Sequence, residues 1–289
     1  MSTTDSVQRF IFENTDIRGE RVCLQASFED ALAAHDYPLP VKRLLGELVA
    51  ASVLLSTTLK FSGLMSLQVK GTGPLSLLMV ECTERKSFRA LARFSGDCEE
   101  GGIEKLIGQG QLVITIDPDK GQRYQGIVPL TYPTLSECLE HYFAQSEQLS
   151  TRIWLASDGY KAAGMLLQAL PASKESSKKL REETWSRLCL LTNTVSDNEL
   201  LSLESESLLS RLYHEEQVRL FDSEPVVFQC NCSRKRSAQI IHSIGKDEAD
   251  SVIREQGQIA MDCQFCNQQY VFSPDDVIDI FNGHEGYLH

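Results

Sequence analysis

The chain has 289 residues, of which 42% are hydrophobic, enough for one large core or for a large domain and a small one. Its formal net charge is −12. This balance argues against a general nucleic-acid binder, because neutralising phosphates requires a basic face.

The N-terminus carries no targeting signal that we can identify. The first ten residues, MSTTDSVQRF, lack the basic and then apolar stretches of a secretory signal peptide. No run approaches the ~18 apolar residues of a membrane span. We therefore expect a soluble cytoplasmic protein that makes no membrane contact. In that reducing compartment, clustered cysteines more often bind metal or sense oxidants than form structural disulfides.

Residues 1–171 are expected to form one α+β domain. A helix is predicted to begin at Pro40, because apolar residues follow at the spacing of a buried helix face. These residues are Val41, Leu44, Leu45, Leu48 and Leu55. Alternating apolar residues then predict two β-hairpins, at 65–79 and at 112–128.

The same domain is predicted to end with a helix and a strand pair. Thr134 and Glu137 have the spacing of a capping box, which marks a helix start. A last pair of strands is predicted within 153–170. Successive hairpins favour a mostly antiparallel sheet with helices packed against it over a doubly wound sheet.

Residues 172–224 are expected to form a metastable helical linker. The segment begins with the polar sequence ASKESSKK. Three short helices are predicted, around Trp185, after the capping box of Ser196 and Glu199, and near Leu208. Isolated helices of this length are marginal in water, so they must gain stability from a neighbour. Their apolar faces would become exposed if that neighbour changed.

Residues 225–289 are expected to form a small C-terminal domain with four clustered cysteines. Cys230 and Cys232 are spaced C-x-C, and Cys263 and Cys266 are spaced C-x-x-C. Two tight turns with two thiolates each supply the four soft ligands of tetrahedral Zn²⁺. A domain of this size usually needs a bound metal ion or a disulfide to stabilise its fold, so we predict one structural zinc ion per chain.

The spacing leaves several roles open for these cysteines. They could form a zinc clamp or two local disulfides, and zinc could serve only to fold the domain. Oxidants attack thiolates, the form in which zinc holds sulfur. Loss of a structural zinc removes roughly 10–16 kcal/mol of apparent binding free energy that is also folding free energy. Oxidation would then unfold the domain, and with it helices that lean on it.

Other polar residues give weaker signals. The basic run Arg234-Lys235-Arg236 fits a zinc ribbon that contacts nucleic acid, a surface that attracts anions, or a solvated turn. His242 and His284 could each replace a cysteine as ligand, although four thiols suffice.

We also find no set of residues with the pattern of a catalytic site. No Ser–His–Asp pattern and no pair of carboxylates stands out. Glu47 and Glu81 lie among apolar residues, and either could simply be ion-paired. We therefore do not expect an enzyme.

With these residues in view, the chain resembles the 33-kilodalton chaperonin family, the redox-regulated heat-shock holdases of bacteria. The four-cysteine pattern is that family's hallmark. The resemblance covers nearly the whole chain, through YPLPVKRLLGELVAA (37–51), LKFSGLMSLQVKGTGPLSLL (59–78), YQGIVPL (124–130), CLEHYFAQSEQL (138–149) and RLYHEEQVRLF (211–221).

The resemblance implies an ATP-independent chaperone that is inactive while its four cysteines bind zinc. Oxidation, assisted by heat, would form the disulfides Cys230–Cys232 and Cys263–Cys266 and release the metal. The zinc domain and linker would unfold, and oxidised chains would form a homodimer that binds unfolding client proteins and prevents their aggregation. The residues alone predict a small domain stabilised by a metal ion and a helical linker of low stability, but they do not predict chaperone activity.

Overall fold

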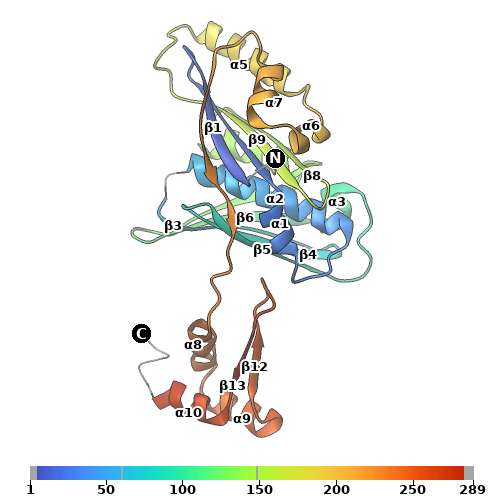
Figure 1. The fold of residues 1–289 in the computed structure, drawn as a ribbon, viewed down its shortest axis with the longest axis vertical. Helices are drawn as coiled ribbons and strands as arrows, with labels where there is room; N and C mark the ends of the chain where they lie inside the picture. The colour runs from blue at the N-terminus through green and yellow to red at the C-terminus, as the bar shows by residue number, and fades with distance from the viewer. Residues whose placement is uncertain (1–4, 60, 148, 283–289) are drawn as a thin grey trace. The chain divides into compact units, whose positions relative to one another are not determined.

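The computed structural model describes residues 5–59, 61–147 and 149–282 (Figure 1). The chain divides into two compact units, Met1–Gln229 and Cys230–His289. The mixture of helices and mostly antiparallel sheets confirms the predicted α+β class. Within the described ranges, no helix has both the length and the apolar character needed to cross a bilayer.

The first unit contains two sheets. All strand pairs of the five-stranded sheet are antiparallel. Its strand order is β10 (Val218–Pro225), β1 (Ser6–Phe12), β2 (Ile17–Leu24), β9 (Ala162–Ala169) and β8 (Thr151–Ser157). The predicted last strand pair is confirmed as β8 and β9, whereas the sequence analysis assigned no strand to β1, β2 or β10.

The six-stranded sheet contains both predicted hairpins, β3–β4 and β6–β7. Its strand order is β11 (Val227–Phe228), β5 (Ser87–Phe94), β4 (Leu75–Thr83), β3 (Gly63–Gly71), β6 (Gly110–Pro118) and β7 (Tyr124–Pro129). The pairing of β11 with β5 is parallel, and the other pairs are antiparallel.

The predicted helix at Pro40 is α2 (Leu39–Thr58), which lies between the two sheets (Figure 1). Because both sheets contact it, most of its residues are buried, including the polar Ser52 and Ser56. The hydroxyls of these two serines donate to the carbonyls of Leu48 and Val53 within the helix, so neither is left unpaired in the core.

Three shorter helices, followed by one π-helical turn, complete this part of the fold. The helices are α1 (Ala26–Leu32), α3 (Gly102–Ile107) and α4 (Leu135–Tyr142), and the turn is η1 (Phe143–Glu147). Thr134 and Glu137 form the predicted capping box at the start of α4.

The predicted linker forms three helices, α5 (Lys178–Thr192), α6 (Asp197–Ser202) and α7 (Ser205–Leu212). Their apolar side chains pack on the face of the five-stranded sheet opposite α2, in a cluster separate from the main core. The neighbour on which these helices pack is thus the five-stranded sheet of their own unit, whereas the sequence analysis expected them to lean on the zinc domain. The boundaries 1–171, 172–224 and 225–289 themselves stay predictions.

The second unit is small. It consists of α8 (Arg234–Ile244), α9 (Lys246–Gln256), the hairpin β12 (Ile259–Asp262) and β13 (Gln269–Phe272), and α10 (Pro274–Asn282). Gly245 and Gly257 separate these elements with φ angles of +95° and +75°, which glycine adopts without steric cost. Among the described residues of this unit, up to Asn282, seven buried apolar residues form its core: Ala238, Ile241, Ala249, Ile259, Phe272, Val277 and Ile280.

Candidate metal centre

Two separate segments of the second unit carry the four cysteines. Cys230 and Cys232 lie just before α8, and Cys263 and Cys266 lie in the turn of the β12–β13 hairpin. This turn is closed by two backbone bonds, from the Cys263 N–H to the Gln268 carbonyl (3.0 Å) and from the Asn267 N–H to the Cys263 carbonyl (2.8 Å). Asn267 has φ of +54°, a conformation that asparagine tolerates better than most residues. The turn thus places two thiols on one side of the hairpin end.

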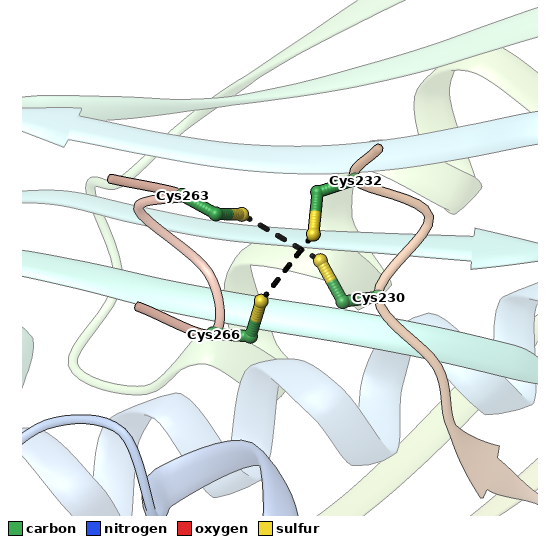
Figure 2. Close-up of side chains that lie close together, drawn as sticks. All are labelled: Cys230, Cys232, Cys263 and Cys266. Carbon is green, nitrogen blue, oxygen red and sulfur yellow. Dashed lines mark hydrogen bonds between the residues drawn. The ribbon is translucent and has the colours of Figure 1, made fainter. Parts of the chain in front are cut away.

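The four sulfur atoms converge on one point (Figure 2). The Sγ atoms of Cys230 and Cys263 are 3.6 Å apart, and those of Cys232 and Cys266 are 3.5 Å apart. All four lie within 4.8 Å of one another. A disulfide requires about 2.05 Å, so these are four separate thiols. A tetrahedral ion about 2.3 Å from each sulfur would separate the sulfurs by about 3.8 Å, so the four cysteines are positioned to bind a metal ion.

The arrangement of the four sulfur atoms does not select a disulfide pairing. Both close contacts join a cysteine of the first motif to one of the second. Any of these thiols can reach more than one partner within the cluster. The pairing of Cys230 with Cys232 and of Cys263 with Cys266 stays a prediction.

The charge balance of the cluster favours a bound cation. Burial, together with the neighbouring thiols, raises the pKa of Cys266 to about 12, although a hydrogen bond from the Gln268 backbone acts in the opposite direction. A divalent cation reverses this effect, because a coordinating thiol is deprotonated outright. Four sulfur donors in a tetrahedral set are typical of Zn²⁺ or of iron–sulfur sites.

The hydroxyl of Tyr270 on β13 donates a hydrogen bond to Cys232 Sγ at 3.2 Å. This bond raises the pKa of Tyr270 to about 12, so the hydroxyl keeps its proton at neutral pH. Sequence analysis missed this residue. The sequence pattern that could have identified Tyr270 is a strand of alternating residues, in which Tyr270 comes two residues before the buried Phe272 and four after Cys266.

The basic run beside the first motif is largely engaged within its own unit. The Arg234 guanidinium lies 2.9 Å from Asp276, donates to the Val271 carbonyl at 2.6 Å, and stacks 4.4 Å from the centre of the Phe272 ring. Arg234 is therefore a packing residue, and its interpretation as a freely solvated charge is wrong. Arg236 donates to the Asn231 carbonyl at 2.8 Å.

Of the two histidines considered as alternative ligands, the structure describes His242. His242 stacks on the Phe281 ring, with 5.3 Å between the ring centres, and does not belong to the cluster. His284 lies outside the described residues.

The two glutamates singled out in the sequence differ in environment. Glu81 is ion-paired with Arg89 at 2.6 Å, as anticipated. No cation lies within ion-pair distance of Glu47 among the described residues, so that suggestion is wrong for Glu47. Burial, and then the negative charge of Asp197, raise the pKa of Glu47 to about 7. Neither residue lies with the cysteine cluster.

Comparison with known proteins agrees with this arrangement. Residues 5–273 match the family model described as Hsp33 protein. A 33 kDa chaperonin of Pseudomonas paraeruginosa is 50% identical over 286 residues, covering 98% of this chain and 96% of that protein. A 33 kDa chaperonin of Azotobacter vinelandii is 48% identical over 286 residues, with the same coverage.

A solved structure shares the fold. The crystal structure of the 33 kDa chaperonin from Thermotoga maritima superimposes with a TM-score of 0.81 and covers 96% of this chain and 98% of its own. The two sequences are 19% identical, so this likeness concerns the fold alone.

Proposed function

The chain belongs to the Hsp33 protein family, and from this premise we propose that it is a redox-regulated, ATP-independent chaperone of the cytoplasm and not an enzyme. The observation that carries the proposal is the four-thiol cluster, held in a unit whose described residues include an apolar core of seven buried side chains. A unit of that kind depends on its metal for folding, so oxidation of its ligands removes its structure.

In the reduced state, Cys230, Cys232, Cys263 and Cys266 hold one Zn²⁺ per chain. The ion supplies the positive charge that keeps the four sulfurs deprotonated and joins the two cysteine segments. The chain's own contacts align these segments, since Arg234 on α8 bonds to the Val271 carbonyl on β13 and pairs with Asp276 on α10.

Oxidation removes the ligands in pairs. Two thiolates, Cys230 with Cys232 or Cys263 with Cys266, give two electrons to one hydrogen peroxide molecule. One S–S bond forms, the O–O bond breaks, and two protons from solvent complete two water molecules. Disulfide sulfur is a poor ligand for zinc, so the four cysteines would no longer hold the ion and the second unit would lose the cross-link between its two cysteine segments.

Client binding follows from exposure of an apolar surface. Helices α5, α6 and α7 cover Phe10, Phe12, Met165 and Leu167 on the five-stranded sheet. When the linker helices unfold together with the second unit, this surface becomes available to unfolding proteins, because large exposed apolar patches bind other apolar chains. Oxidised chains also form homodimers in this proposal.

The test follows zinc, thiols and client protection in one sample. Reduced, zinc-loaded protein is treated with peroxide at raised temperature while aggregation of a denatured client is measured. We expect zinc release, loss of four thiols and suppression of aggregation together. In the double variant Cys230→Ser/Cys232→Ser, peroxide should no longer trigger zinc release and client protection together. The variant Cys98→Ser, whose cysteine lies outside the cluster, should respond to peroxide as the parent does.

Two results would contradict the proposal. In one, the double variant keeps normal oxidative activation. In the other, the parent protein loses zinc without any gain in client protection. A zinc ribbon that binds RNA would then be the better description, and it predicts salt-dependent affinity that falls when Arg234, Lys235 and Arg236 are neutralised.

A further inference from the structure

A side chain outside the four ligands bonds directly to one of them. The Tyr270 hydroxyl donates to Cys232 Sγ at 3.2 Å. Tyr270 lies on β13, whereas Cys232 precedes α8, so this bond joins the hairpin of the second cysteine motif to the segment of the first. Because a side chain supplies the donor, one substitution can remove it, which is not true of a backbone N–H.

The position of Tyr270 is fixed by its neighbours on β13. Tyr270 and Phe272 are two residues apart, so their side chains point to the same face of the strand. Phe272 is fully buried in the small core, and the Val271 carbonyl between them accepts a hydrogen bond from Arg234. Tyr270 pairs with Met261 across the hairpin. The strand therefore holds the hydroxyl against Cys232 through contacts that involve no metal ligand.

We propose that Tyr270 is a positioning residue of the redox switch, whose hydroxyl slows the reaction of Cys232 with peroxide. The inference rests on the redox function proposed above. A hydrogen bond to a thiolate draws electron density from the sulfur and makes it less nucleophilic. Cys232 is thereby protected at low oxidant levels, and the threshold of the switch rises.

The affected step is the first attack on the oxidant. The Cys232 sulfur gives an electron pair to one oxygen of hydrogen peroxide, an S–O bond forms, the O–O bond breaks, and hydroxide leaves. A second thiolate then attacks this sulfur, an S–S bond forms, and a second hydroxide leaves. Each hydroxide takes a proton from solvent and becomes water. The electron density on Cys232 sets the rate of the first step.

The size of the effect follows from known scales. The hydrogen bond is only partly lost as the sulfur gives up charge in the transition state, so its removal speeds the reaction of Cys232 by a small factor, about threefold.

The experiment compares Tyr270→Phe with the parent in the full-length, reduced, zinc-loaded chain. Zinc release under excess hydrogen peroxide is followed with a chromogenic chelator, and sulfenic acids are trapped at early times and located by mass spectrometry. We expect about threefold faster peroxide-driven zinc release and a larger share of early sulfenic acid at Cys232. The matched control is Tyr160→Phe, on an exposed tyrosine of the first unit, which should behave as the parent.

The rate at which the chelator removes zinc in the absence of peroxide distinguishes a chemical role of Tyr270 from a structural one. The proposal requires this passive rate to stay unchanged in Tyr270→Phe. An equal rise of the passive and peroxide-driven rates would overturn it, as would an unchanged peroxide-driven rate. Failure of the chaperone proposal looks different, because the parent would then release zinc without protecting a client while the rates of the two proteins could still be compared.

Discussion

The two units of this protein differ in what holds them together. The main core of the first unit surrounds α2 and contains several times as many buried apolar side chains as the core of the second. Among its described residues the second unit has seven, together with four half-buried cysteines. A small core rarely supplies more than a few kcal/mol of stability, so under the proposed function the second unit would depend on its metal more than the first unit does. A signal that acts on thiolates could then unfold the second unit and spare the first.

The interface that holds the linker helices differs from the core of either unit. Their interface with the sheet is apolar, but it also contains the buried Arg21, whose guanidinium donates to the carbonyls of Leu200 and Leu203 and, at 2.9 Å, to the Ser205 hydroxyl. No carboxylate is ion-paired with Arg21 among the described residues. Burying a charge that has no carboxylate within ion-pair distance lowers the net stability of this interface, since the charge regains water when the helices leave. Under the proposed function, this is the interface that opens.

Removal of zinc is the strongest way to test the contrast between the units. Chelation under reducing conditions should remove roughly 10–16 kcal/mol of binding free energy and unfold the second unit alone. Hydrogen exchange measured by mass spectrometry should show loss of protection in β12, β13 and α10, with α2 unchanged. Persistent protection of the hairpin would mean that the seven-residue core suffices without metal.

Weakening the linker interface should uncouple the linker from the metal. Leu208 is fully buried against the sheet, and Leu208→Ala should destabilise docking by about 2–5 kcal/mol. We expect limited proteolysis between α5 and α7, and client protection, in the reduced, zinc-loaded protein. Leu190→Ala is the matched control, because Leu190 on α5 is 68% exposed. Equal resistance of both variants would argue against a marginal interface.

The pH dependence of the first unit should report on Glu47. Its pKa is raised from 4.5 to about 7, so the folded form holds a proton that the unfolded form has lost between these values. As far as Glu47 is concerned, the free energy of unfolding is therefore greatest below about pH 4.5 and falls as the pH rises. Above about pH 7 the folded protein bears the full cost of the buried carboxylate charge. Glu47→Gln should gain up to about 3 kcal/mol relative to the parent at pH 8 and little at pH 4.5, measured by urea denaturation. An equal gain at both pH values would contradict this account.

The smallest expected effect concerns the start of the linker. The carboxylate of Asp16 accepts hydrogen bonds from the Ser173 hydroxyl at 2.7 Å and from the backbone N–H groups of Ser173 and Lys174 at 3.0 Å each. Burial would raise the pKa of Asp16, but these bonds outweigh it and lower the pKa to about 2. Asp16→Asn keeps an acceptor but loses the charge, so we expect a loss of about 1 kcal/mol.

The pH dependence of this contact provides its check. A lowered pKa means that the contribution of Asp16 is present above about pH 4 and is lost as the pH falls through about 2. Hydrogen exchange of the backbone N–H groups at 173–175 should therefore be faster in Asp16→Asn at neutral pH. Unchanged exchange there would show that the carboxylate does not hold the linker.

Local patterns determined much of the fold. The hairpins β3–β4 and β6–β7 and the capping boxes at Thr134 and Ser196 depend on residues close in sequence, so they could be predicted. Strands β1 and β2 were missed because their own residues do not alternate. In β1, apolar residues face both sides, with Val7 in the main core and Phe10 under the linker helices, and in β2 the charged Glu20 and Arg21 are buried.

The sequence by itself determined two pairs of neighbouring thiols in a small unit, because each tight turn brings its own pair together, and it predicted that the pairs meet because Zn²⁺ takes four ligands. Only the tertiary structure decided that β10 returns to pair with β1 after more than 200 residues, that Arg21 lies beneath the linker, and that Tyr270 reaches Cys232. These contacts join residues far apart in the chain or on different elements. Their partners are chosen by packing of whole elements, and no local spacing in the sequence encodes that choice.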